Sequence, residues 1–169
     1  AVRLQDGRKL WRHTEPKPET RGHVARLIEV TPHGGSRRAY FTSSRGTLYA
    51  LGRPAGLVQW KLDLQMSNPT AIRWGWTLYA ADLQVACAVD LHENKVKRRK
   101  NFVPEKTIQK NSSRAGRVGA RTRPVLGDGV VDVAGGSYVW AISREDGELL
   151  WEADRGRANE ISEAPTLAD

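Results

Sequence analysis

The sequence has only one cysteine, Cys87, and no long apolar run. A single thiol excludes an internal disulfide, and no stretch approaches the roughly 18 apolar residues of a membrane-spanning helix. Charged residues follow Ala1 almost at once, so no signal peptide is recognised. The missing initiator methionine predicts a processed chain or an excised fragment.

Catalytic motifs are also lacking. There is no G-x-S-x-G, no P-loop and no G-x-G-x-x-G. None of the four histidines forms a short metal-ligand spacing with a carboxylate; they are His13, His23, His33 and His92. We therefore expect no catalytic residue and no metal site, and we favour a binding protein over an enzyme, which stays an open alternative.

The sequence has few stretches that suit a helix. Gly and Pro interrupt every candidate window longer than ten residues except 84–103, and that window alternates as strands do. Six Trp stand against two Phe, which indicates a fold with a recurring Trp position. These features predict an all-β protein.

The positive charge is concentrated in one segment. The chain carries a net charge of +8. Residues 95–123 contain eleven basic side chains and one acidic side chain, a charge of +10, so the remaining residues together carry −2. The basic character is therefore local and does not describe the whole surface.

Four segments of the chain align without gaps: 1–11, 50–60, 88–98 and 141–151. Each begins with Ala, has Gly or Asn six residues later and ends in Trp or Arg. The Gly column contains Gly7, Gly56, Asn94 and Gly147, and the last column contains Trp11, Trp60, Arg98 and Trp151. Gly and Asn accept the left-handed backbone of a tight hairpin, so each segment predicts two strands joined by such a turn.

Further short apolar segments precede each aligned hairpin, so each unit contains four short strands. A four-stranded repeat of about 40 residues is typical of a propeller blade. We predict one partial β-propeller of about three to four four-stranded antiparallel blades. Its parts are a partial blade at 1–14, blades at 23–64, 67–103 and 121–154, a basic loop at 101–120, and the start of a further blade at 161–169.

The segments 46–60 and 125–151 resemble the pyrroloquinoline-quinone (PQQ)-like repeat, which reads roughly G-x-L-Y-A-L-D-x-x-T-G-K-x-x-W. The resemblance implies that Trp11, Trp60 and Trp151 dock between neighbouring blades, over hairpins that contain Gly7, Gly56 and Gly147. The second complete blade departs from the pattern because Arg98 replaces Trp and Asn94 replaces Gly. We expect its junction with the following blade to be the weakest. Asp132 also departs, since the aligned positions are Phe41 and Tyr79.

The resemblance implies several functions, because blades of this type occur in outer-membrane assembly lipoproteins, membrane-kinase sensors and quinoprotein dehydrogenases. We expect a protein-binding scaffold in an extracytoplasmic, periplasmic or secreted location, with a protein partner or self-association through open blade edges. The enzyme alternative implies PQQ on a Trp floor with calcium held by Glu, Asn and Asp. Trp74 and Trp76 are either such a platform or a turn with aromatic packing.

A third hypothesis concerns the basic segment. Clustered Lys and Arg bind nucleic acid or anionic lipid, and the candidate contacts are Lys97, Arg98, Arg99, Lys100, Arg114 and Arg117. Aromatic side chains that stack on bases are sparse there. A solvated loop or an acidic protein surface fits the same residues, so these alternatives stay open.

Overall fold

The computed structural model describes residues 5–12, 25–27, 38–82, 84–101, 123–135 and 138–154. Within them the chain forms three separate four-stranded antiparallel sheets and no helix. This confirms the prediction of an all-β, partial propeller fold. We call the sheets blade one, blade two and blade three in chain order.

Consecutive strands are neighbours in every sheet, as in a simple meander. Blade one contains β1 (Ala25–Leu27), β2 (Arg38–Ser43), β3 (Thr47–Gly52) and β4 (Val58–Asp63). Blade two contains β5 (Thr70–Trp74), β6 (Thr77–Ala81), β7 (Val85–Asp90) and β8 (Lys95–Asn101). Blade three contains β9 (Val125–Leu126), β10 (Val130–Gly135), β11 (Tyr138–Ser143) and β12 (Leu149–Asp154).

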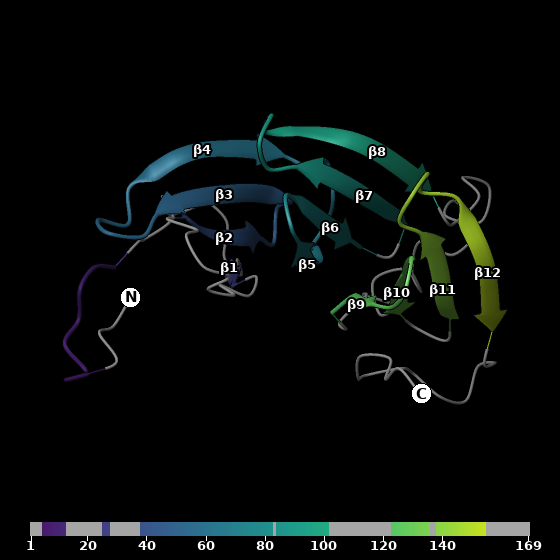
Figure 1. The fold of residues 1–169 in the computed structure, drawn as a ribbon, viewed down its shortest axis with the longest axis horizontal. Coiled ribbons are helices and arrows are strands. Elements are labelled where there is room, and N and C mark those ends of the chain that lie inside the picture. The colour runs from purple at the N-terminus through teal and green to yellow at the C-terminus, as the bar shows by residue number, and fades with distance from the viewer. Residues whose placement is uncertain are drawn as a thin grey trace.

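The three blades follow one another along an arc (Figure 1). The fourth strands β4, β8 and β12 lie on its convex side, and the first strands β1, β5 and β9 lie toward its concave side. The N-terminal segment, residues 5–12, and blade three lie at opposite ends of the arc. This arrangement of radial sheets is that of a propeller.

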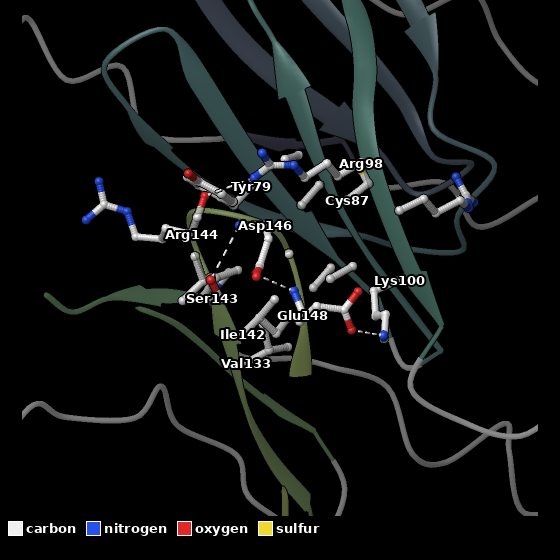
Figure 2. Close-up of a pocket in the computed structure, with 18 residues that line it drawn as sticks. Tyr79, Cys87, Arg98, Lys100, Val133, Ile142, Ser143, Arg144, Asp146 and Glu148 are labelled. Carbon is white, nitrogen blue, oxygen red and sulfur yellow. Dashed lines mark hydrogen bonds and ion pairs between the residues drawn. The ribbon is translucent and has the colours of Figure 1, made fainter. Parts of the chain in front are cut away.

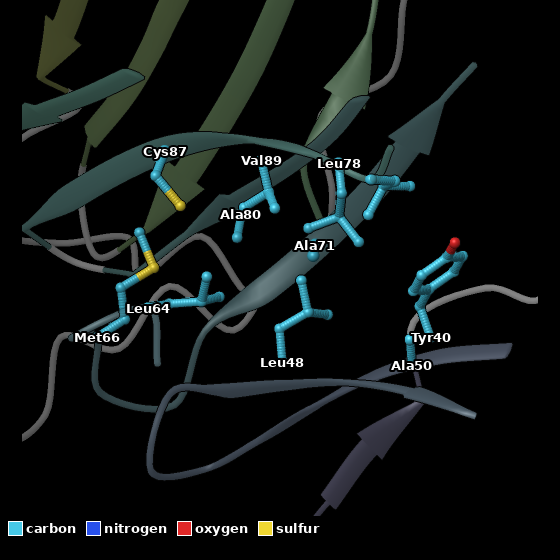
Figure 3. Close-up of a cluster of buried hydrophobic side chains, with 11 residues drawn as sticks. Tyr40, Leu48, Ala50, Leu64, Met66, Ala71, Leu78, Ala80, Cys87 and Val89 are labelled. Carbon is cyan, nitrogen blue, oxygen red and sulfur yellow. The ribbon is translucent and has the colours of Figure 1, made fainter. Parts of the chain in front are cut away.

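The core lies between the blades. Tyr40, Leu48 and Ala50 of blade one share one buried cluster with blade two residues such as Leu78 and Val89. Figure 3 shows these side chains between the two sheets. A second cluster joins blade two to blade three; its buried members are Ala81, Val131, Val133, Trp140 and Ile142. Each sheet therefore buries its apolar surface against its neighbours.

An irregularity recurs at the same place in every blade. The register of the third and fourth strands shifts directly after the shared alanine, at Ala50, Ala88 and Ala141. The residues opposite these alanines are Trp60, Arg98 and Trp151. A β-bulge re-aims a neighbouring side chain, so all three blades present the last repeat column in the same local geometry.

The strand register corrects one part of the repeat alignment. Asp132 lies opposite Ala141, Tyr79 lies opposite Ala88, and Tyr40 lies opposite Ala50. The blade one equivalent of Asp132 is therefore Tyr40, and the prediction of Phe41 was wrong. The turn between β2 and β3 is one residue longer than its counterparts, which displaces a gapless alignment by one position.

No described helix has the length and apolar character needed to cross a membrane.

Candidate functional site

The N-terminal segment, residues 5–12, docks on blade one through Trp11 and Gly56. Gly56 has a φ of +69°, and a Cβ added there would lie 2.3 Å from the Trp11 ring. The Trp11 indole also donates from Nε1 to the carbonyl oxygen of Arg53 at 2.5 Å. Arg53 is three residues before Gly56. The β3–β4 turn thus provides both a surface for the ring, at Gly56, and a hydrogen-bond acceptor beside it, at Arg53.

Arg98 makes the same two contacts between blades two and three. Gly147 has a φ of +80°, and a Cβ there would lie 3.3 Å from Cδ of Arg98. The Arg98 guanidinium donates to the carbonyl oxygen of Arg144 at 3.3 Å, and Arg144 is three residues before Gly147. Arg98 therefore occupies the position of the docking Trp in both packing and hydrogen bonding.

The junction between blades one and two differs. Trp60 packs against the buried cluster, and its ring centroid is 5.9 Å from that of Tyr40. Its Nε1 is buried, and among the described residues it has no hydrogen-bond acceptor. Asn94 occupies the hairpin position with a φ of +58°, so it keeps the left-handed turn. A buried N–H without an acceptor lowers the stability of a fold, and this junction contains one.

The ends of the arc leave two members of the repeat columns undocked. Trp151 is 50% exposed at the outer strand of blade three. Gly7 has a φ of +68°, and no described atom lies within 4 Å of the position its Cβ would take. The structure thus places Trp11 on Gly56, but neither Trp151 nor Gly7 meets a counterpart among the described residues.

A cavity of about 70 Å³ lies beside Arg98 between blades two and three. Figure 2 shows Cys87 and Arg98 on blade two and Val133 and Ile142 on blade three. An Arg side chain fills less space at a junction than an indole ring, and the cavity lies where the repeat departs from Trp. We expected this junction to be the weakest, and that expectation stays a prediction.

We expect Arg98→Trp to raise the free energy of unfolding by about 1 kcal/mol, because an indole fills part of this cavity and rests on Gly147. Arg98→Ala removes both Arg98 contacts and is expected to lower it by about 1 kcal/mol. Urea denaturation measures both values. Lys61→Trp adds the same ring at an exposed position and is the control; an equal gain there would contradict the cavity-filling explanation.

Cys87 is a buried thiol in the wall of the same cavity. Burial raises the pKa of this thiol to about 12. The thiolate is the reactive form, so we expect no reaction with a disulfide reagent at neutral pH until the protein is unfolded in denaturant. Rapid labelling of the native protein would show that the cavity opens.

The basic residues of β8 have protein partners, some within blade two and some on neighbouring parts of the arc. Lys97 pairs with Asp90 at 2.5 Å, and Lys100 pairs with Glu148 of blade three. Arg99 donates at 2.7 Å to two carbonyl oxygens, those of Leu64 and Gln65. Four residues of the polyanion hypothesis, those on β8, thus form ion pairs or hydrogen bonds with other parts of the protein. Arg114 and Arg117 lie outside the described residues.

Asp90 is held in its charged form by this network. The hydrogen bond from Lys97 and the backbone N–H groups of Glu93 and His92 lower the Asp90 pKa to about 2. The carboxylate accepts from these two backbone groups at 3.0 Å and 2.7 Å. The Lys97–Asp90 pair therefore persists through mildly acidic pH, and the ammonium group is engaged wherever the chain is folded near neutrality.

Heparin chromatography tests the polyanion hypothesis. We compare two fourfold Gln variants: one on β8, at Lys97, Arg98, Arg99 and Lys100, and one at exposed cations elsewhere, at Arg45, Arg53, Lys61 and Arg123. We expect the two variants to elute at similar salt, because the β8 cations already have protein partners. A much larger shift for the β8 variant would support a polyanion site, since specific phosphate-like contacts make retention strongly salt-dependent.

The turn between β5 and β6 of blade two exposes two aromatic side chains. Trp74, Gly75 and Trp76, which we call the Trp hairpin, connect β5 to β6. The two indoles are 57% and 60% exposed. The guanidinium of Arg144, from blade three, lies 4.7 Å from the Trp74 ring centroid, and that of Arg73 lies 5.9 Å from the Trp76 centroid.

The Trp hairpin therefore lies in a composite surface. Arg73 also lies 5.7 Å from the ring of Tyr40 in blade one, and His92 meets the Trp76 ring edge to face at 6.0 Å. Guanidinium groups over indole faces fix the rings by cation–π attraction. Blades two and three thus contribute to one aromatic and cationic surface, and Arg73 also reaches the buried Tyr40 ring of blade one.

The described residues show no ligand set for calcium. No group of three or more His, Cys, Asp or Glu side chains that could hold a metal occurs among them. Asp132 does not supply one: one of its carboxylate oxygens is buried without a hydrogen bond to any described residue, and burial raises its pKa. The described residues therefore show no ligand set of the kind that the resemblance implies for PQQ-bound calcium.

The fold is shared with solved propellers of low sequence identity. The chain superposes on BamB from Moraxella catarrhalis with a TM-score of 0.58 and 18% identity, over 79% of this chain and 38% of that one. A quinohemoprotein alcohol dehydrogenase from Pseudomonas putida gives 0.57 and 17%, over 76% and 21% of the two chains. The computationally designed Ika4 protein gives 0.56 and 11%, over 80% and 77%.

This chain therefore spans well under two thirds of the two natural proteins, and these likenesses establish the fold alone. A search of curated proteins found no match. The family model described as "Outer membrane protein assembly factor BamB" matches residues 1–169. With its repeat columns, its three meander blades and this match over its whole length, the chain belongs to the PQQ-repeat β-propeller family of BamB.

Proposed function

We propose that the chain is a non-catalytic propeller scaffold that binds a protein partner through the Trp hairpin. The observation that carries this proposal is the exposure of Trp74 and Trp76 at 57% and 60%, with guanidinium groups held against both rings. Monomeric proteins rarely expose contiguous aromatic surface without a partner. Trp and Arg are also the residues that dominate binding energy in protein interfaces.

The surroundings of the hairpin suit a preorganised interface. Arg73 donates from Nε to the carbonyl oxygen of Gly75 at 2.8 Å, which ties the guanidinium to the hairpin. The backbone N–H of Leu91 donates to the carbonyl oxygen of Trp76 at 2.9 Å, which ties the hairpin to the next turn of the same blade. Side chains already fixed in the free protein lose less entropy on binding.

The family supports a protein partner and an extracytoplasmic location. Its description names outer membrane protein assembly, and the superposed Moraxella protein carries the same name. The dehydrogenase relatives share the fold equally well, so fold alone does not choose between the roles. The proposal of a scaffold rests on the exposed aromatic surface.

Photo-crosslinking tests the proposal. A benzophenone side chain at position 76 is expected to form a covalent protein adduct in a native cell extract, and Trp74→Ala is expected to remove it. The same probe at Lys61, exposed on β4, is the matched control and is expected to give no such adduct. An adduct pattern that is equal at both positions, or insensitive to Trp74, would overturn the assignment of this surface.

A cofactor titration separates the scaffold from the enzyme. Addition of PQQ with calcium is expected to leave the absorbance spectrum of the cofactor unchanged. Saturable spectral change that needs both calcium and Trp74 would instead support the quinoprotein alternative.

A further inference from the structure

The cavity between blades two and three has an apolar interior. Its volume is about 70 Å³. Buried or half-buried apolar side chains from both sheets line it; they include Ala81, Ala86, Val131, Val133 and Ile142. Figure 2 shows Val133 and Ile142 on the side of blade three. Ligand sites in proteins usually combine such an apolar interior with a few polar groups at its edge.

Short side chains on blade two create this space. Ala86 and Ala88 are alternate residues of β7, and Ala81 lies opposite Ala86 on β6. These three side chains therefore lie on one face of the sheet, and Ala81 and Ala86 pack with Val131 of blade three. Each offers only a methyl group, so the two sheets are incompletely packed at this point.

Two cations lie on the same face of blade two. Arg98 and Lys100 are alternate residues of β8, and they lie opposite Ala88 and Ala86. Both line the cavity, and Arg98 is exposed to solvent. The apolar interior therefore continues into a rim that carries positive charge.

The other charged side chains at this rim already have partners. Lys100 forms an ion pair with Glu148. The Asp146 carboxylate accepts a hydrogen bond from the backbone N–H of Glu148 at 3.0 Å. Arg98, by contrast, forms no ion pair with a carboxylate in the described part of the chain.

The Arg98 guanidinium has donors to offer to a ligand. It donates to the carbonyl oxygen of Arg144 at a distance of 3.3 Å, which is long for a hydrogen bond. A guanidinium carries five N–H donors, and it binds carboxylates through two parallel hydrogen bonds. An anionic oxygen pair at the rim therefore suits this side chain better than a neutral or cationic group does.

The volume of the cavity limits the apolar part of a ligand. An apolar cavity of about 150 Å³ admits benzene. The space beside Arg98 is about half as large, so it holds an aliphatic tail of about three carbon atoms. A ring or a long acyl chain does not fit.

We propose that this cavity binds a short aliphatic carboxylate, with butyrate as the model ligand. The tail occupies the interior beside Ala86 and Val131, and the carboxylate accepts hydrogen bonds from the Arg98 guanidinium. The site goes beyond the proposed function, because neither Trp74 nor Trp76 lines the cavity. Binding at one surface therefore stands or fails without the other.

A titration followed by two-dimensional ¹H–¹⁵N NMR at neutral pH and constant ionic strength tests the site. Butyrate is expected to shift amides of β7 and β10 saturably, with a Kd of about 1 mM for so small a ligand. Acetate is expected to bind at least about tenfold more weakly, since it buries a shorter tail. Hexanoate is expected to stay within about threefold of butyrate, because the cavity is then full. A steady gain up to hexanoate would indicate a fatty acyl ligand and overturn the assignment of a short acid.

The role of the guanidinium is tested by Arg98→Gln, which removes the charge. We expect this variant to raise the Kd of butyrate at least about tenfold and to leave the weaker binding of neutral butyramide unchanged. Arg45→Gln, at an exposed arginine in the β2–β3 turn, is the matched control and keeps the wild-type Kd. Equal butyrate affinity of the Arg98→Gln variant and the wild type contradicts a carboxylate site.

The role of the cavity is tested by Ala86→Leu, which places an isobutyl group in the interior. This variant is expected to show no saturable shift with butyrate, whereas Ala55→Leu, in the exposed β3–β4 turn, binds normally. Circular dichroism checks that Ala86→Leu is folded; if it is not, Arg98→Trp fills the cavity from its rim and gives the same test. A wild type without saturable shifts, or a filled cavity that still binds butyrate, overturns the proposal.

Discussion

Gly46→Ala is expected to lower the free energy of unfolding by about 2–5 kcal/mol. Gly46 has a φ of +81°, where an L side chain costs about 1–2 kcal/mol. The added Cβ would also lie 2.2 Å from the carbonyl oxygen of Met66. That atom is backbone and cannot rotate away, so a further cost of about 1–3 kcal/mol is expected from overpacking.

Met66 cannot retreat easily, because its side chain belongs to the buried cluster between blades one and two. The adjacent chain is also fixed to the turn: the N–H of Leu64 donates to the carbonyl oxygen of Gly46 at 2.8 Å. The substitution therefore strains the connection between two blades as well as one hairpin.

Gly75→Ala is the matched control for this experiment. Gly75 also has a positive φ, +57°, but a Cβ there has no neighbour within 4 Å. Its expected cost is the backbone term alone, about 1–2 kcal/mol. Urea denaturation followed by Trp fluorescence gives both values. Equal losses for the two variants would show that the contact with Met66 contributes nothing.

The sequence predicts the repeat hairpins well because their requirement is local. A tight turn needs one residue with positive φ, and Gly7, Gly56, Asn94 and Gly147 all have it. The role of Gly46 as a close contact was not predictable in this way. Its neighbour, Met66, lies in the next connection along the chain, and the approach of the two backbones depends on how the blades pack.

The identity of the Asp132 counterpart could not be read from spacing. A gapless alignment assumes that equivalent turns have equal length, and the β2–β3 turn breaks that assumption by one residue. Because side chains alternate between the two faces of a strand, a shift of one residue moves a position to the opposite face. Only strand pairing reveals Tyr40 as the equivalent residue.

The partners of the basic residues on β8 likewise could not be predicted from the sequence. Lys100 meets Glu148 on blade three, and Arg99 reaches the carbonyl oxygen of Leu64 beyond blade one. These partners are far away along the chain and are brought close only by the arc of blades. The sequence therefore could not show that these cations have partners within the fold, and polyanion binding by the basic run stays a prediction.

The exposure of Trp74 and Trp76 could also not be predicted from the sequence. An apolar residue in a short strand is expected to be buried, and β5 begins with buried residues at Thr70 and Ala71. The two Trp flank a turn at the end of that strand, where the sheet ends and only the Arg144 side chain of blade three lies over Trp74. Their exposure follows from this position and not from their residue type.

Leu78→Ala is expected to lower the free energy of unfolding by about 3 kcal/mol. Leu78 is 0% exposed on β6 and lies in the cluster that blade two shares with blade one. Removing a fully buried Leu side chain costs its transfer free energy and leaves a cavity, together about 2–5 kcal/mol. Leu57→Ala removes the same atoms from a side chain that is 71% exposed, so its loss is expected to stay within about 0.5 kcal/mol.

The Leu78→Ala substitution is also expected to affect strands of both blades. The cluster takes Leu48 and Ala50 from β3 of blade one as well as Leu78 and Val89 from blade two. A cavity at Leu78 therefore removes contacts from both sheets. Native-state hydrogen exchange is expected to show faster exchange of β3 amides together with those of β6 and β7. A loss confined to blade two would mean that each sheet is stable by itself, and the clusters between blades would then not be what unites the arc.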